Sequence, residues 1–182
     1  NFVTNSTKLA KAGFAESSQT LDVLTTVLNA YGMSADKVST VSDMLVQTQN
    51  KGKVTVGELA SSMGKIIPTA NASNVSLEQL CAGYAIMTSK GIAAAETTTY
   101  MNSMLNELSK SGSTTDKLLR QKMGGSFAEL MASGKSLGEI LGGIQEEASK
   151  SGLALSDMFS SSEAGKAAMS LLSNGVDGFN SS

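Results

Sequence analysis

Residues 52–80 read GKVTVGELASSMGKIIPTANASNVSLEQL, and this stretch decides the fold. Twice within it an apolar residue precedes a hydroxyl residue, and a second apolar residue stands five positions after the first. The two cases are Val54-Thr55 with Leu59 and Val75-Ser76 with Leu80. This order is typical of a helix N-terminus, where the hydroxyl accepts a hydrogen bond from a free amide and the apolar side chains pack together. It predicts two helices inside this stretch.

The same order continues outward on both sides. Met33-Ser34 with Val38 repeats it, and Phe14 and Ile92 are further apolar starts. We therefore predict helices that begin near residues 15, 34, 55, 76 and 93. Two of the starts are also predicted capping boxes, in which a glutamate or glutamine three positions after the cap returns a second hydrogen bond. These are Thr55 with Glu58 and Ser76 with Gln79. A further capping box is predicted at Ser136 with Glu139, where Lys135 stands in place of the apolar residue.

Helix ends are predicted at glycines that lie shortly before the next start. Gly13, Gly32, Gly52 and Gly91 hold such positions, where a left-handed residue can cap the preceding helix. Pro68 should end or kink the helix that begins near Thr55.

Apolar residues between these boundaries recur at spacings of three or four, which places them on one face of a helix. Examples are Leu21, Leu24 and Leu28; Leu59, Met63 and Ile66; Leu77, Leu80, Tyr84 and Met87; and Met101, Leu105 and Leu108. The predicted fold class is all-α, with short amphipathic helices in successive hairpins and a solenoid as one possible arrangement.

Four regions are expected along the chain. Residues 1–13 form an N-terminal lead-in, 14–110 a helical-hairpin core, 111–174 a second helical subregion, and 175–182 a frayed tail. The two central regions are separated at SKSGSTTD (109–116), which has the composition of a linker. In the second subregion we expect a helix interrupted at Gly124-Gly125, a helix from Leu137, and a last one through Leu171.

Composition argues against several functions. The net charge is −2 and no run of like charge exceeds a pair, so specific nucleic-acid binding is not expected. The chain has no histidine and one cysteine, Cys81, which excludes Ser–His–Asp catalysis and zinc sites of histidines or several thiolates. The sequence thus offers no catalytic, cofactor-binding or metal-binding residue, and predicts a protein that is not an enzyme and needs no cofactor.

Three other patterns have a structural explanation. The strings GELASSMGK (57–65) and SGKS (133–136) lack the glycine spacing of a phosphate-binding loop and are interpreted as helix. Glu146 and Glu147 are interpreted as solvated neighbours on a helix. Cys81 and the ten methionines are predicted to fill the core, since the chain has no tryptophan.

No stretch approaches a membrane span, so no membrane contact is expected from this segment. The chain begins with Asn1 rather than methionine, and we expect it to be a piece of a longer protein.

Five segments, taken in order, carry a resemblance to a known family. They are LTTVLNAYGMSADKVSTVSDML (24–45), residues 52–80, TSKGIAAAETTTYMNSMLNEL (88–108), MASGKSLGEIL (131–141) and SSSEAGKAAMSLLS (160–173). Their succession, from about Leu9 to Ser173, resembles the core region of phage tail tape measure proteins. Asn74 stands where that family more often has glycine, and Cys81 replaces a small residue.

The resemblance implies a structural protein of a phage or prophage tail that acts in tail assembly and tail-length determination. It implies a place in the tail lumen of the virion, assembly in the bacterial host cytoplasm, and release at genome ejection. Implied partners are sister copies, with a trimer as the first expectation, tail tube and tail tip proteins, and assembly chaperones. The alternative interpretation is a cytoplasmic helical-repeat module that binds other proteins.

Overall fold

The computed structural model describes residues 17–173, and within them every regular element is helical. The helices of the N-terminal half are α2 (Ser17–Ala30), α3 (Val38–Lys51), α4 (Val56–Ser62), α5 (Ile67–Ala72), α6 (Leu77–Ser89) and α7 (Ala94–Ser109). Those of the C-terminal half are α8 (Thr114–Lys122), α9 (Phe127–Ala132), α10 (Leu137–Lys150) and α11 (Ser162–Leu171). Short 3-10 turns are η1 (Ala35–Lys37), η2 (Met63–Lys65) and η3 (Leu155–Met158). The predicted all-α class is confirmed.

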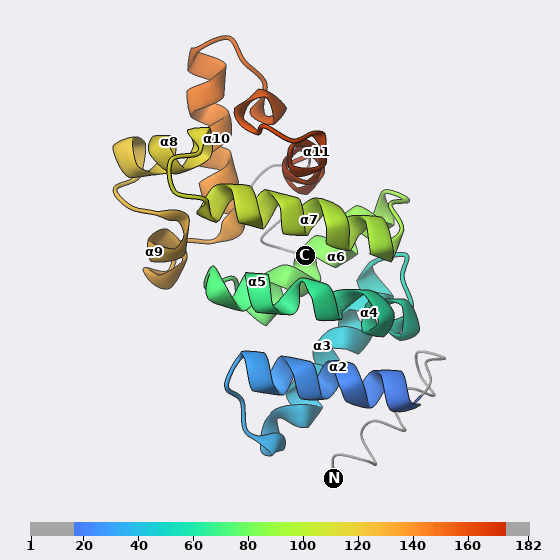
Figure 1. Cartoon of the computed structure of the whole chain (residues 1–182). Coiled ribbons are helices and arrows are strands. Elements are labelled where there is room, and N and C mark those ends of the chain that lie inside the picture. The colour runs from blue at the N-terminus through green and yellow to red at the C-terminus, as the bar shows by residue number, and fades with distance from the viewer. Residues whose placement is uncertain (1–16, 174–182) are drawn as a thin grey trace.

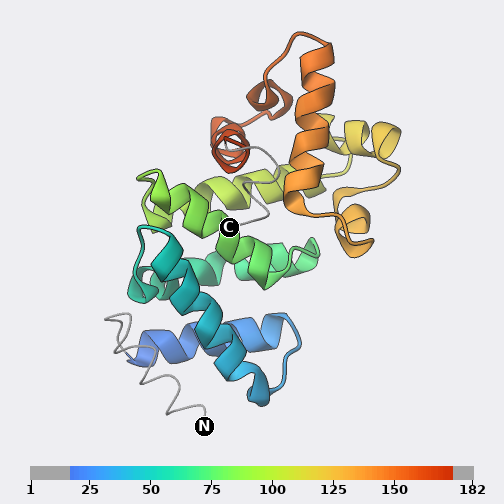
Figure 2. The same ribbon diagram turned by 180° about the vertical axis from the view of Figure 1, so that it is seen from behind.

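The helices are arranged along one long direction, from α2 and α3 at one end to α8, α10 and α11 at the other (Figure 1). Seen from behind, α3, α6 and α10 lie along the opposite side of the molecule (Figure 2). The buried apolar side chains form one continuous cluster, which extends from Val23 on α2 to Leu172 just after α11.

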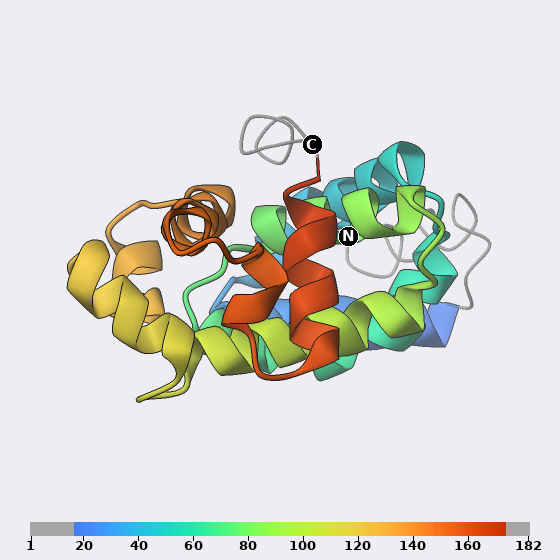
Figure 3. The ribbon, with the colours of Figure 1, turned by 90° about the horizontal axis from the view of Figure 1, so that it is seen from above.

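Packing is most extensive between helices that are not sequence neighbours. α3 packs on α6, α2 on α4, and α11 on both α7 and α6. From above, α11 lies across α7 rather than along it (Figure 3). The C-terminal helix therefore returns to the helices of the N-terminal half, and both halves share the core.

The predicted helix starts at 55, 76 and 93 are confirmed within one residue, at Val56, Leu77 and Ala94. The start near 34 is found in two steps, as η1 from Ala35 and α3 from Val38. The start near 15, the end at Gly13, the lead-in 1–13 and the tail 175–182 lie outside the described residues.

One turn geometry joins five pairs of consecutive helical elements. A left-handed residue ends the first, the next residue donates its N–H to the carbonyl five positions earlier, and an extended residue starts the second. The five turns are Gly32-Met33-Ser34, Asn74-Val75-Ser76, Gly91-Ile92-Ala93, Gly134-Lys135-Ser136 and Gly152-Leu153-Ala154. Asn74, with φ 62°, holds the glycine position, as its tolerance of that conformation predicts.

Gly52 departs from the prediction. Its φ is −104° and its ψ −170°, so it is extended and is not a left-handed cap. A Cβ placed there would lie 2.4 Å from Thr88 Oγ1 and 3.0 Å from Ala85 Cα on α6. Glycine is needed at this position because α3 ends against the backbone of α6.

The capping predictions are confirmed at Thr55–Glu58 and Ser136–Glu139, where both reciprocal hydrogen bonds are present. At Ser76 only half of the box forms: Gln79 N–H donates to Ser76 Oγ at 3.2 Å. Gln79 Oε1 instead accepts from Leu137 N at 2.6 Å, because the start of α10 lies beside this turn.

The predicted cap at Ser34 is wrong. Its side chain accepts no amide hydrogen bond, and its hydroxyl donates to the carboxylate of Asp36. A capping box that the sequence analysis missed lies at Ser126 and Glu129, at the start of α9.

The predicted linker between the two halves also needs correction. SKSGSTTD is not wholly a linker, because α7 extends to Ser109 and α8 begins at Thr114. The buried Asp116 accepts a hydrogen bond from Gly112 N at 2.9 Å, which closes the turn onto the new helix. The interruption at Gly124-Gly125 and the unbroken helix from Leu137 are confirmed. The prediction for Pro68 in the N-terminal half is wrong: α4 already ends at Ser62, and Pro68 stands in the first turn of α5, where a missing N–H is tolerated.

Candidate interaction surfaces

The two sequences with some likeness to a phosphate-binding loop, and the paired glutamates of α10, lie on different elements. Residues 57–65 lie on α4 and η2, as predicted, whereas residues 133–136 form the α9–α10 turn rather than helix. Glu147 lies 3.2 Å and Glu146 4.0 Å from the ammonium of Lys150, so these carboxylates share one cation on α10. Between residues 17 and 173, no group of three or more Asp, Glu or Cys side chains has the arrangement of a metal site. The same residues include no helix that is long and apolar enough to cross a membrane.

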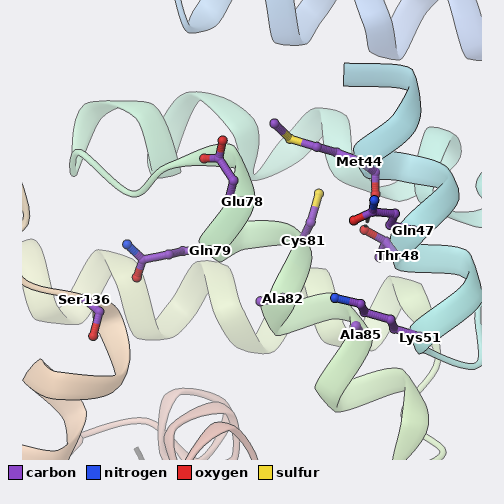
Figure 4. A pocket seen from close by; sticks show the side chains of 10 residues that line it. All are labelled: Met44, Gln47, Thr48, Lys51, Glu78, Gln79, Cys81, Ala82, Ala85 and Ser136. Atoms are coloured by element: carbon purple, nitrogen blue, oxygen red, sulfur yellow. Dashed lines mark hydrogen bonds between the residues drawn. The ribbon is translucent and has the colours of Figure 1, made fainter. Parts of the chain in front are cut away.

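One surface hollow lies between α3, α6 and the start of α10 (Figure 4). Its volume is about 350 Å³. It is lined by Met44, Gln47, Thr48 and Lys51 of α3, by Glu78, Gln79, Cys81, Ala82 and Ala85 of α6, and by Ser136. The segment that follows α3 is joined to α6 through Thr88, whose hydroxyl accepts a hydrogen bond from Lys53 N at 3.2 Å.

Cys81 lies at the base of this hollow and is 6% exposed. Burial raises the pKa of its thiol to about 11, and a hydrogen bond with Thr48 opposes only part of this rise. The thiol is therefore protonated at neutral pH and a poor nucleophile. The prediction that Cys81 is buried is confirmed.

A second, larger hollow of about 820 Å³ lies between α7, α11 and the Gly91-Ile92 turn. Its walls combine the aromatic rings of Tyr100 and Phe159 with several serines and Lys166. The Lys166 ammonium lies 5.5 Å from the centre of the Tyr100 ring, a distance that suits a cation–π contact. Tyr100 donates a hydrogen bond to Glu96 at 3.2 Å, which raises the pKa of the phenol.

Glu107 of α7 binds Ser160 and Ser161, two residues that line this hollow. Its carboxylate accepts hydrogen bonds from Ser160 N at 2.7 Å, Ser160 Oγ at 2.9 Å and Ser161 N at 3.4 Å. One side chain of α7 thereby holds the connection that leads into α11. The sequence analysis missed this interaction because 53 residues separate Glu107 from Ser160.

The third hollow, of about 600 Å³, lies between α10 and α11. It contains Leu153 and Met169, the two large apolar side chains that are exposed in the described part of the chain. Most of the other methionines confirm the core prediction, since Met63, Met87, Met101 and Met104 are buried. Met169 is the exception.

The residues that line these three hollows are similar in kind. They contain uncharged hydroxyls, amides and apolar side chains with few charges, a composition that suits contact with other protein surfaces.

Comparison with known proteins adds a second kind of evidence. The model of a family described as phage-related minor tail protein matches residues 1–173. The chain is also 40% identical over 177 residues to a protein named probable tape measure protein, from Clostridium phage phiCD119. That match covers 94% of this chain but 19% of the relative, so the chain spans about a fifth of the relative's length. No solved structure matches the chain.

Proposed function

Because this chain belongs to the family of phage-related minor tail proteins, and is thus part of a virion component, we propose that it is a structural segment of a tail tape measure protein. In this role it helps to determine tail length during assembly and performs no catalysis. The observation that carries the proposal is the match over 94% of the chain to a relative named probable tape measure protein. The alternative interpretation of the sequence was a cytoplasmic helical-repeat module. A module unrelated to phage does not agree with this family membership.

The fold supports a structural role through its packing. Helices that are distant in sequence share one core, and the same turn recurs five times. Because the helices are packed together in this way, the segment has a defined size. A compact unit of 157 residues (17–173) has a radius of gyration of about 15 Å and spans roughly 40 Å. The same residues in one continuous helix would span about 235 Å.

The location and partners form part of the proposal. The parent protein is placed in the tail lumen, after assembly in the host cytoplasm, and leaves the virion at genome ejection. Its partners are sister copies, with a trimer as the first expectation, tail tube and tip proteins, and assembly chaperones. Low charge supports this placement, because a net charge of −2 gives little attraction to the DNA that follows through the tube.

The test is an in-frame deletion of residues 17–173 from the parent gene, followed by electron microscopy of the tails. We expect shorter tails: by about 4 nm if the segment is folded in the tail as described, and by up to about 24 nm if it is extended. Duplication of the same residues should lengthen the tails by a similar amount. Ser76→Ala, which keeps the length, is the matched control.

Tails of unchanged length in both the deletion and the duplication would refute a role in length determination. Failure of the deletion phage to form any tails would support a role in assembly, and the duplication would then decide the question of length.

A further inference from the structure

The elements η3 and α11 form one unit, which we call the strap (residues 155–171). They fit closely together, since a Cβ placed at Gly165 of α11 would lie 3.2 Å from the Cβ of Ser156 on η3. The connection from α10 to the strap has no buried residue, and every residue from 149 to 154 is exposed. In Figure 1 this connection lies at the end of the molecule farthest from α2.

The strap is held mainly by helices that are distant in sequence. The contact of α11 with α7 is the most extensive between any two helices of residues 17–173, and α11 also packs on α6. Leu171 lies over Gly83 of α6, where an added Cβ would be 3.6 Å from the Leu171 Cδ2. The carboxylate of Glu107 holds the start of α11. The site that receives the strap is thus made by α6, α7 and α10, and a strap from a second copy would fit it equally well.

The connection between α10 and the strap has the properties of a hinge. It has four residues, 151–154, and it reverses the chain at Gly152, whose φ is 71°. Glycine adopts left-handed, helical and extended conformations at similar cost, so the same residues can also hold a straight path. Short hinges of this kind favour the exchange of an identical element between two copies of a chain.

Leu153 in this hinge is an apolar side chain that the closed chain leaves in solvent. It is 46% exposed, whereas Val75, at the same position of its own turn, is 1% exposed. Met169, on the outer face of α11, is 43% exposed and lines the same hollow as Leu153. Two large apolar side chains beside a hinge are typical of a surface that another chain covers.

We propose that the strap is exchanged between two copies of this chain, so that η3 and α11 of one copy dock on α6, α7 and α10 of the other. The contacts that hold the strap in the closed chain form again across the pair. The free energies of the two states therefore differ in the hinge, in any contact between the two copies at the hinge, and in the entropy of association.

The two hinges of the exchanged pair run side by side about its two-fold axis. Leu153 of each copy then packs against its equivalent, a contact that the closed chain cannot make. The proposal does not rest on the function proposed above, because it follows from the packing of this chain alone.

The first test changes the length of the hinge in the 182-residue chain. Deletion of Ser151 and Gly152 removes the left-handed residue, so the strap cannot turn back onto its own α7, and we expect a dimer. Insertion of Gly-Ser-Gly-Ser after Gly152 lets the strap reach its own site, and we expect a monomer. The same insertion after Gly134, in the turn before α10, is the matched control and should leave the proportion of dimer as in the unaltered chain.

Size-exclusion chromatography with light scattering measures these masses, and circular dichroism shows that the helices are intact. A deletion variant that is helical and monomeric would overturn the proposal. If the deletion variant does not fold, the second test decides.

The second test links the strap of one chain to the receiving helix of another, in a Cys81→Ala background that removes the native thiol. One chain carries Tyr100→Cys and the other Lys166→Cys, because the ammonium of Lys166 lies 5.5 Å from the centre of the Tyr100 ring. The two are mixed at high concentration, incubated in urea near the unfolding midpoint, returned to buffer and treated with a short bismaleimide. We expect covalent dimers in which peptide mass analysis finds positions 100 and 166 linked.

Two controls accompany the mixture. A chain with both substitutions should become linked within itself as a monomer, which shows that the reagent spans the pair. Lys37→Cys, on η1 at the other end of the molecule, replaces Lys166→Cys in the second control and should give few linked dimers with Tyr100→Cys.

Dimers without a link between positions 100 and 166 would be side-by-side pairs of closed chains and would overturn the proposal. A mixture that stays monomeric, with no more linked product than the Lys37→Cys control, would overturn it as well. Leu153→Ser should lower the proportion of dimer, because it removes the contact that only the exchanged pair makes. An unchanged proportion would contradict the contact between the hinges.

Discussion

A methyl group added at Gly52 would collide with α6, which makes this glycine a test of the α3–α6 contact. The added Cβ would lie 3.0 Å from the Cα of Ala85, and backbone cannot move aside as a side chain can. We expect Gly52→Ala to destabilise the protein by about 1–3 kcal/mol, the usual cost of overpacking. Urea unfolding followed by circular dichroism measures this change.

Gly64→Ala is the matched control for Gly52, because a Cβ at Gly64 meets nothing within 4 Å. Its effect should stay within about 0.5 kcal/mol. Equal midpoints for the two variants would show that α3 and α6 are not in close contact at Gly52.

Ser76 is the second residue whose contribution to the free energy of unfolding can be measured. It accepts the Gln79 amide at the start of α6, so Ser76→Ala should cost about 0.5–2 kcal/mol. Ser111→Ala, at an exposed position between α7 and α8, controls for the loss of a hydroxyl. An unchanged midpoint for Ser76→Ala would contradict the cap.

The Cys81 thiol offers a direct probe of burial. Because it is buried and its pKa is raised to about 11, we expect a water-soluble thiol reagent at pH 7.5 to label it far more slowly than free cysteine. Labelling should reach the free-cysteine rate at urea concentrations that unfold the protein. Fast labelling without urea would place Cys81 at the surface.

At the scale of helices, acidic residues at two N-termini predict a loss of stability in acid. The Gly112 amide, then Arg120, lowers the pKa of Asp116 at the start of α8, and Ser126 lowers that of Glu129 at the start of α9. A carboxylate whose pKa is lower in the folded than in the unfolded chain stabilises the fold at pH values above the unfolded pKa, which is near 4. This contribution is lost as the pH falls through the folded pKa.

We therefore expect the urea midpoint to fall between about pH 5 and pH 2, and Asp116→Asn to reduce the size of that fall. Asp22→Asn, which removes an exposed carboxylate from α2, controls for the change in net charge. If Asp116→Asn leaves the pH profile unaltered, the hydrogen bonds to Asp116 do not contribute to stability.

At the scale of the whole molecule, the return of α11 onto α7 and α6 predicts that the two halves depend on each other. A fragment of residues 1–110 keeps α2 to α7 but loses α11, which covers apolar surface of α7. We expect this fragment to unfold at lower urea than the full chain and to bind a hydrophobic dye such as ANS. A fragment as stable as the full chain would show that residues 14–110 fold as an independent domain.

The sequence by itself determined the all-α class and most helix starts, because those depend on residues within about five positions. Thr55 with Glu58 and Asn74 before Val75 could be interpreted without any knowledge of the rest of the chain. Even the start of α3 was predicted near its place, although the hydroxyl of Ser34 bonds to Asp36 instead of an amide.

Only the tertiary structure decided which helices pack together, and with them the places of the hollows. An amphipathic stripe shows that a helix has a buried face, but any other stripe could cover it. The partner of Gln79 is 58 residues away at Leu137, and the requirement for glycine at position 52 comes from α6. Such contacts depend on how distant segments meet, and no local pattern in one sequence contains that information.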